Sequence, residues 1–145
     1  MNDIKYQSND LVDTEDIGLQ IGLTLAFTAC VYLNGEMGAG KTTLTKSIIR
    51  SLGYDGEVTS PTYNLIQEYP VTNGVVYHMD LYRLDDPSEI EFLGIEDLWS
   101  ANSLFLIEWA EKGHGYLIKP SHEIAICKNH KLSEFARTIT LKEVS

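Results

Sequence analysis

The stretch Gly35-Glu36-Met37-Gly38-Ala39-Gly40-Lys41-Thr42 decides how this chain folds. It matches the pattern G-x-x-x-x-G-K-[ST], in which a glycine-rich loop follows a strand, opens a helix and binds phosphate. The preceding residues 30–34 form a short apolar run of strand-forming types, which predicts a buried strand. Residues 43–50 carry apolar side chains at helical spacing, which predicts a helix. The stretch therefore connects a predicted strand to a predicted helix, as a phosphate-binding loop requires.

The residue types in this loop suit the chemistry of phosphate binding. Glycines allow backbone N–H groups to turn inward and approach phosphate oxygens. The N-terminus of the helix adds unpaired donors and the positive end of its dipole. In this pattern Lys41 reaches the β- and γ-phosphates, and the hydroxyl of Thr42 ligates Mg²⁺. The residues that we expect around the nucleotide phosphates are Met37, Gly38, Ala39, Gly40, Lys41, Thr42 and Thr43.

Length and composition indicate one globular domain over residues 1–145. No apolar run is long enough to span a bilayer, so we expect no membrane association. The N-terminal residues lack the basic and apolar regions of a secretory signal. Cys30 and Cys127 have no metal or redox spacing, so we expect both to be buried free thiols. Together these features predict a soluble cytoplasmic protein.

The charge of the chain argues against tight direct binding of tRNA or DNA. The formal net charge is −10, from eleven Lys and Arg residues against twenty-one Asp and Glu residues. Nucleic-acid affinity comes mainly from Lys and Arg side chains on phosphates. Between Asp85 and Glu111 the chain has eight acidic residues and no basic one. We therefore expect no tight direct binding of nucleic acid by this chain.

The remaining elements predict a mixed sheet. Residues 5–8 read as an edge strand, and residues 14–28 as a helix that is capped near Asp13. Asn73-Gly74 is a strong hairpin signal, and it lies between two strand-like segments. The other expected elements are short helical turns at 86–93 and 95–99, a buried strand at 103–107, and two C-terminal strands at 122–127 and 136–141. The fold class is α/β: a single P-loop NTPase-like domain whose mixed, partly antiparallel central sheet is flanked by helices.

Two carboxylates follow apolar strands. Asp80 comes directly after residues 75–79, and Glu108 directly after residues 104–107. In an open α/β sheet, ligands gather at the carboxyl ends of the strands. A P-loop site needs a second carboxylate to hold Mg²⁺ or to orient water. A solvent-exposed acid at a strand end would give the same pattern, so spacing alone leaves both roles open for each residue.

Three other side chains are candidates with an ordinary structural alternative. Thr62, after Ser60-Pro61, has the place of a switch threonine that senses γ-phosphate and Mg²⁺, although a turn threonine bonded to local backbone is the more common case. His78 alone would be interpreted as a packed or surface histidine. Trp109 could stack on a base or a partner, with core packing as the default.

Four motifs in a fixed order resemble the TsaE (YjeE) ATPase family. They are residues 35–44, Ser60-Pro61-Thr62-Tyr63, residues 78–84 (His-Met-Asp-Leu-Tyr-Arg-Leu) and residues 107–112 (Ile-Glu-Trp-Ala-Glu-Lys). Their order and spacing and the chain length all agree with the family, and the resemblance covers roughly residues 10–142. The chain departs from the family pattern at Met37 and Met79, where other apolar residues are common. The family fold is a small P-loop α/β domain with a mixed sheet, in agreement with the hairpin inferred above.

The resemblance implies a bacterial ATPase that uses ATP and Mg²⁺ and assists the TsaB–TsaD pair. That machinery attaches a threonylcarbamoyl group to N6 of the adenosine next to the anticodon, in tRNAs that read codons beginning with A. Lys41 and Thr42 match the family's phosphate and Mg²⁺ positions, and Glu108 matches a second Mg²⁺-associated carboxylate. Asp80 matches a Walker-B-like acid, and Thr62 matches the switch position.

The resemblance also implies roles for residues outside these positions. Trp109 matches a tryptophan tied to nucleotide-dependent function. Leu11 and Thr14 fall in a region that covers the adenine, and Arg137 on a C-terminal strand matches a nucleotide contact.

Two other classes of function remain open from the sequence. A small-molecule P-loop kinase would need an acceptor pocket and a lid with several arginines, and neither is evident in this chain; Asp80 could then serve as its general base. A nucleotide-binding adaptor would bind ATP without turnover. No N-K-x-D-type guanine motif is visible, which favours ATP over GTP.

Overall fold

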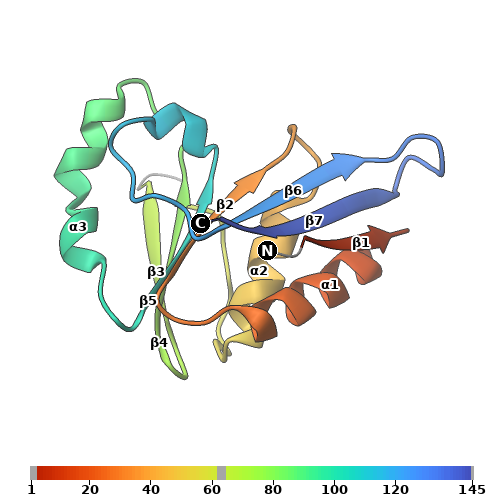
Figure 1. Ribbon diagram of the computed structural model, residues 1–145, viewed down its shortest axis with the longest axis horizontal. Helices are drawn as coiled ribbons and strands as arrows, with labels where there is room; N and C mark the ends of the chain where they lie inside the picture. Colours follow the sequence, from red (N-terminus) through yellow and green to blue (C-terminus); the bar gives the residue numbers. More distant parts are fainter. Residues whose placement is uncertain (1–2, 62–64, 145) are drawn as a thin grey trace.

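The computed structural model describes residues 3–61 and 65–144. Its centre is one seven-stranded sheet with the order β1-β7-β6-β2-β5-β4-β3 (Figure 1). The strands are β1 (Ile4–Ser8), β2 (Ala29–Asn34), β3 (Ile66–Val71), β4 (Gly74–Asp80), β5 (Ser103–Glu108), β6 (His122–Lys128) and β7 (Arg137–Glu143). The helices are α1 (Leu11–Thr24), α2 (Lys41–Ser51), α3 (Ile95–Leu98) and the 3-10 helices η1 (Pro87–Leu93) and η2 (Ala110–Gly113).

The sheet is mixed, as the sequence predicts. The strand β2 runs parallel to both of its neighbours, β5 and β6, and β4 runs parallel to β5. The pairs β3–β4, β6–β7 and β1–β7 are antiparallel. The predicted hairpin is confirmed: Val71 pairs with Gly74 across a two-residue turn. A Cβ on Gly74 would lie 1.9 Å from the carbonyl oxygen of Asn102, so this position has no room for a side chain.

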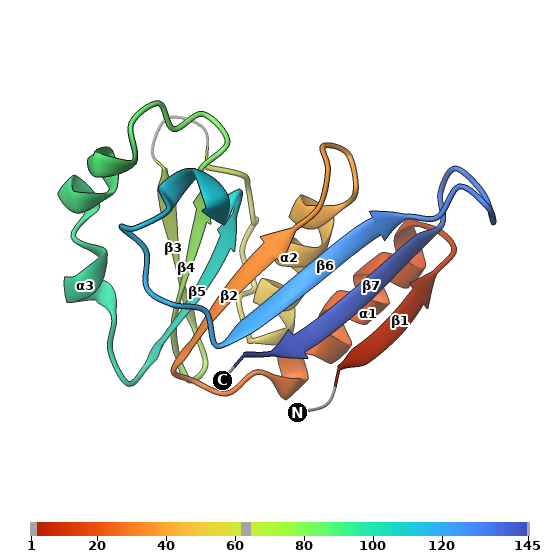
Figure 2. The same ribbon diagram turned by 45° about the horizontal axis from the view of Figure 1, so that its top comes forward.

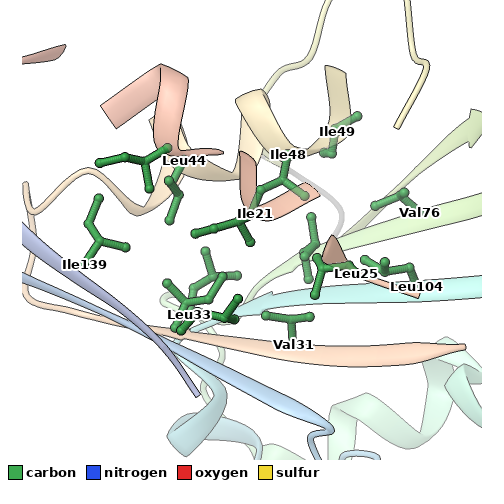
Figure 3. Close-up of a cluster of buried hydrophobic side chains, with 14 of the residues drawn as sticks. Ile21, Leu25, Val31, Leu33, Leu44, Ile48, Ile49, Val76, Leu104 and Ile139 are labelled. Carbon is green, nitrogen blue, oxygen red and sulfur yellow. The ribbon is translucent and has the colours of Figure 1, made fainter. Parts of the chain in front are cut away.

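Two hydrophobic cores lie on opposite faces of the sheet. Helices α1 and α2 cover one face, where Ile21, Leu33 and Ile48 are completely buried (Figures 2 and 3). The segments η1, α3 and η2 cover the other face over β4 and β5. Successive residues of β5 alternate between the two cores, with Leu104 in the first and Phe105 in the second. Because both faces of β5 are covered, the strand is apolar from Leu104 to Ile107, between Ser103 and Glu108 at its ends.

The first helix was predicted at residues 14–28, but α1 spans Leu11–Thr24. The prediction was therefore wrong at both ends. Asp10 is the N-cap of α1, and its side chain accepts a hydrogen bond from the Asp13 N–H at 2.9 Å. Asp13, the predicted cap, lies inside the first turn, and its carboxylate accepts from the Asn9 N–H at 2.9 Å. Two acids three residues apart offer alternative caps, and the earlier one adds a turn of helix. At the other end of the helix, Leu25 has an extended backbone, so the apolar residues from Leu25 onward lie outside α1.

The two cysteines differ in burial. Cys30 on β2 is completely buried, and burial raises the pKa of its thiol to about 12. Cys127 on β6 is exposed, so its predicted burial was wrong. Ile124 and Ile126 of the same strand point into the core under the helices, and the period of two places Cys127 on the opposite face. None of the helices in the described part of the chain is long and apolar enough to cross a membrane.

The helices α1 and α2 approach closely at two glycines of α1. A Cβ on Gly18 would lie 2.5 Å from the Cβ of Ser47 and 3.1 Å from the carbonyl oxygen of Leu44. A Cβ on Gly22 would lie 1.7 Å from the Oγ of Ser51. These distances leave no space for a side chain. The close contact matters for the site described next, because α2 begins directly after the glycine-rich loop.

We expect Gly18→Val to lower the free energy of unfolding by about 1–3 kcal/mol, since it overpacks the α1–α2 contact. Urea denaturation with an unchanged m-value would measure this loss. Gln20→Val introduces the same side chain on the exposed face of α1 and should change the stability by no more than about 0.5 kcal/mol. Equal losses in the two variants would mean that the helix contact does not limit the packing.

Candidate functional site

The glycine-rich loop joins the end of β2 to the start of α2 (Figure 2). Gly38 and Gly40 have φ angles of 79° and 109°, in the left-handed region that glycine adopts without strain. At Gly35 the carbonyl oxygen of Ile126 would lie 2.8 Å from an added Cβ, so a neighbouring strand excludes a side chain there. Gly40 is the N-cap of α2, and no side chain in residues 3–61 and 65–144 caps that end of the helix. The loop thus presents the free helix N-terminus that an anion requires.

A cavity of about 570 Å³ lies between this loop and the carboxyl ends of β4 and β5. This volume is in the usual range for small-molecule sites. From the residues predicted by sequence, its lining includes Met37, Gly38, Gly40, Lys41, Thr42, Thr43, Asp80, Glu108 and Trp109. Residues remote in the sequence therefore converge on one space.

The two predicted carboxylates are neighbours. Asp80 and Glu108 are paired residues at the ends of the parallel strands β4 and β5. Glu108 is only 2% exposed. Its Oε2 lies 2.6 Å from Nε2 of His78, and its Oε1 accepts a long, 3.4 Å hydrogen bond from the hydroxyl of Thr42. The Glu108 carboxylate therefore has a partner on each oxygen.

Asp80 is more open than Glu108. It accepts a hydrogen bond from the Tyr82 N–H at 3.1 Å. Burial raises the pKa of the Asp80 carboxyl above its usual range, and the charge of Glu108 adds to this effect, while the Tyr82 N–H opposes it. A carboxylate with a raised pKa beside a cavity is a candidate for handling a proton or a water.

Lys41 is held in the site by two groups. Its ammonium donates to the carbonyl oxygen of Gly35 and lies 3.7 Å from the centroid of the Trp109 ring, a cation–π contact. Desolvation lowers the pKa of Lys41, and the negative charges of Glu108, Glu111 and Asp80 oppose that effect. Lys41 is therefore a buried cation directed at the space where phosphate charge would lie.

Trp109 has a backbone conformation that is uncommon for its residue type. Its φ of 59° is in the left-handed region, which costs energy for any residue other than glycine. The ring is half-buried, packs against Tyr82 at a centroid distance of 5.0 Å, and faces Lys41. Trp109 is therefore part of the cavity wall as well as of a core.

Four predicted residues are not among the lining of the cavity. Ala39 belongs to the loop but turns its side chain into the core, where it is 1% exposed. The hydroxyl of Thr14 is hydrogen-bonded to the hydroxyl of Ser8 at an O–O distance of 2.7 Å. The side chain of Leu11, at the start of α1, is 61% exposed. Arg137, the fourth, is described below. Adenine contacts by Leu11 and Thr14 stay predictions. Thr62 lies outside the described residues, so its switch role also stays a prediction.

Arg137 binds the backbone of the glycine-rich loop. Its Nε donates to the carbonyl oxygen of Ala39 at 2.9 Å, and its Nη2 lies 3.4 Å from that of Gly38. Its Nη1 donates to the carbonyl oxygens of Glu134 and Ala136 at 2.8 and 2.9 Å. In a trans peptide the N–H points opposite to the C=O, so the bond to Ala39 directs the Gly40 N–H away from Arg137. Arg137 thus ties β7 to the loop.

The sequence reasoning missed several residues of this site. Ser60, Pro61, Leu65, Tyr82 and Arg83 also line the cavity. His78 was interpreted as a packed or surface histidine, and it proves to be bonded to Glu108. One signal could have identified it: His78 lies two residues before Asp80, so the period of two in a strand places both on one face.

The site fits a nucleotide with a divalent cation. The Thr42 hydroxyl and the Glu108 carboxylate are oxygen ligands of the kind that Mg²⁺ prefers. Among residues 3–61 and 65–144, no group of three or more His, Cys, Asp and Glu residues could hold a metal ion without further ligands. Mg²⁺ commonly binds through one or two protein groups together with substrate phosphates, which is the arrangement available here.

Comparison with known proteins gives one consistent family. Residues 8–139 match the family model described as "Threonylcarbamoyl adenosine biosynthesis protein TsaE". The chain is 50% identical over 111 residues to the tRNA threonylcarbamoyladenosine biosynthesis protein TsaE of Haemophilus influenzae, covering 77% of this chain and 68% of that protein. It is 36% identical over 115 residues to the protein of the same name from Synechocystis, covering 77% and 73%.

A solved structure has the same fold. The crystal structure of YdiB from Bacillus subtilis superposes with a TM-score of 0.77 at 26% sequence identity. The match covers 99% of this chain and 87% of that one.

We expect Arg137→Ala to weaken nucleotide binding about tenfold, both with and without Mg²⁺, and to lower Tm, since it frees loop carbonyls. Titration calorimetry and thermal unfolding would measure both effects. Lys142→Ala removes a positive charge from an exposed position on the same strand and should leave both unchanged. A loss of affinity in Arg137→Ala with an unchanged Tm would instead support a direct nucleotide contact.

We expect Asp80→Asn to raise Tm at pH 7. An acid whose pKa is higher in the folded state than in the unfolded state destabilises the fold above the folded pKa and has no such effect below the unfolded pKa. The amide removes that cost and can still accept from the Tyr82 N–H. The gain in Tm should shrink as the pH falls toward about 4, the usual range of aspartate. Thermal unfolding of both proteins at several pH values checks this, and a gain independent of pH would contradict it.

Proposed function

Because the chain belongs to the TsaE family of tRNA threonylcarbamoyladenosine biosynthesis proteins, we propose that it binds and slowly hydrolyses ATP to support this modification, as a partner-dependent ATPase that acts with TsaB and TsaD. The observation that carries the proposal is the convergence of Lys41, Thr42 and Glu108 on one cavity beside a free helix N-terminus. In this proposal the protein works in the cytoplasm.

The loop and Lys41 bind the triphosphate of the substrate. Backbone N–H groups at the start of α2 face the phosphate oxygens, and the helix dipole favours their negative charge. Lys41 exchanges its contact with the Trp109 ring for the β- and γ-phosphates. Thr42 and Glu108 hold Mg²⁺, which when bound neutralises charge on the phosphates of the substrate.

Asp80 and Glu108 serve the hydrolytic step at the end of the sheet. In this proposal Asp80 accepts a hydrogen bond from the attacking water, and its raised pKa suits a group that takes part in proton transfer. Fast phosphoryl transfer also needs a cation at the transition state. In the described part of the lining, Arg83 is the arginine that borders the cavity, and it is exposed. The proposed partners complete or close the site, which accounts for slow turnover by the chain alone.

The net charge of −10 supports a model in which the partner proteins, rather than this chain, bind the tRNA. A chain with about twice as many acidic as basic residues repels the tRNA backbone. The TsaB–TsaD pair would then hold the tRNA, and this chain would supply a nucleotide-dependent step.

The decisive experiment measures phosphate release from Mg·ATP by this chain alone and after addition of TsaB and TsaD from the same organism. We expect slow release that rises with the pair. Lys41→Ala should lower the rate at least about a hundredfold in both conditions, with circular dichroism and Tm as controls for folding.

Three results would contradict the proposal. Turnover that is indifferent to TsaB and TsaD would exclude the partner-dependent reaction. Phosphate transferred to a metabolite, rather than to water, would favour the kinase. ATP binding without turnover under every partner condition would favour the adaptor.

A further inference from the structure

We propose that His78 is a positioning residue, which holds the Glu108 carboxylate in the orientation that the nucleotide site needs. This inference rests on the proposed function, because it concerns the carboxylate assigned there to Mg²⁺. His78 itself is not among the residues that line the cavity, so it acts through Glu108.

The contact between the two side chains is short and buried. Nε2 of His78 lies 2.6 Å from Oε2 of Glu108, and the residues are 1% and 2% exposed. An ionised carboxylate has only lone pairs, so the imidazole N–H donates in this hydrogen bond. The bond occupies Oε2 and leaves Oε1 facing Thr42, at 3.4 Å. A flexible glutamate side chain is thereby held with one chosen oxygen toward the metal-binding hydroxyl.

The strand register explains why histidine occupies this position. In the parallel pairing of β4 and β5, Asp80 is opposite Glu108, and His78 is opposite Leu106. His78 and Asp80 lie on one face of β4. Asp80 is the last residue of the strand, and His78 is two residues before it. Asp80 therefore reaches the cavity, whereas His78 reaches Glu108 from behind, out of solvent.

The second nitrogen of the ring supports a fixed hydrogen-bonding role. Among the described residues, Nδ1 of His78 is buried and has no hydrogen-bond partner. A proton on Nδ1 would bury an unpaired N–H, which is costly. A proton on Nε2 has Glu108 as its partner. The surroundings of the ring thus favour Nε2 as the donor that orients the carboxylate.

Residues that hydrogen-bond to a metal ligand commonly change metal affinity when they are substituted. The loss is typically ten- to a hundredfold, about the magnitude expected here. A purely structural role for the His78–Glu108 pair predicts something different. It would lower stability on substitution and would leave the effect of Mg²⁺ on nucleotide binding unchanged.

The test compares His78→Leu, which has no donor, with His78→Gln, whose amide can donate toward Glu108. Calorimetric titration with the non-hydrolysable analogue AMPPNP, in EDTA and in Mg²⁺, gives the gain in affinity due to the metal. We expect His78→Leu to lose about ten- to a hundredfold of that gain, with metal-free affinity within about twofold of wild type. His78→Gln should keep most of it.

Two controls separate positioning from stability. Val76→Ala opens a cavity on the same face of the same strand, and it should lower Tm while leaving the Mg²⁺ effect unchanged. In a Glu108→Gln background, His78→Leu should no longer change the Mg²⁺ effect, because no carboxylate remains to be oriented. If His78→Leu alone does not fold, NMR of the wild-type histidine ring tests the hydrogen bond without that variant.

Nitrogen NMR of the wild-type histidine ring gives a readout independent of binding. We expect a proton on Nε2, and a changed Nε2 signal in Glu108→Gln. An Nε2 without a proton would overturn the inference, as would a His78→Leu protein with the full Mg²⁺ effect. If the wild type does not bind the nucleotide, the proposed function fails and this inference fails with it. If the wild type binds with a normal Mg²⁺ effect and His78→Leu retains it, only this inference fails.

Discussion

The burial of the Glu108 carboxylate is the constraint on which the rest of this structure depends. A charge that is 2% exposed needs hydrogen-bond donors within the protein, and here they come from His78 on β4 and Thr42 on α2. Three elements must therefore meet at one side chain. The parallel pairing of β5 with β4 on one side and with β2, which leads through the loop into α2, on the other brings them together. The apolar cores on both faces of the sheet supply the stability that this buried polar cluster does not.

Several elements together hold the glycine-rich loop and Lys41 in place. The loop glycines Gly38 and Gly40 have left-handed backbone angles, and Arg137 on β7 binds the loop carbonyls. Lys41 rests between the Gly35 carbonyl and the Trp109 ring, at the mouth of the space that phosphate would fill. The strained backbone of Trp109 fits the same arrangement, since it aims the ring at Lys41.

Local patterns predicted most of this fold, and they failed where two local solutions were equally good. The Asn73-Gly74 pair predicted the hairpin because such residues favour tight turns, although the two-residue turn itself is Thr72-Asn73 and Gly74 is the first residue of β4. The start of α1 was misplaced because Asp10 and Asp13 are both good caps, and only contacts with the rest of the fold choose between them. Cys127 was misplaced because its residue type suggested burial, whereas strand parity decided its face.

The sequence by itself determined the phosphate-binding loop, the mixed sheet and the presence of acids at two strand ends. These features depend on neighbouring residues, whose chemistry is local. Only the tertiary structure decided that His78 bonds Glu108, that Arg137 holds the loop backbone and that Lys41 lies over Trp109. Each of these contacts joins residues that are between 30 and 98 positions apart in the sequence and lie on separate elements. Strand order and register set such contacts, and no short stretch of sequence contains that information.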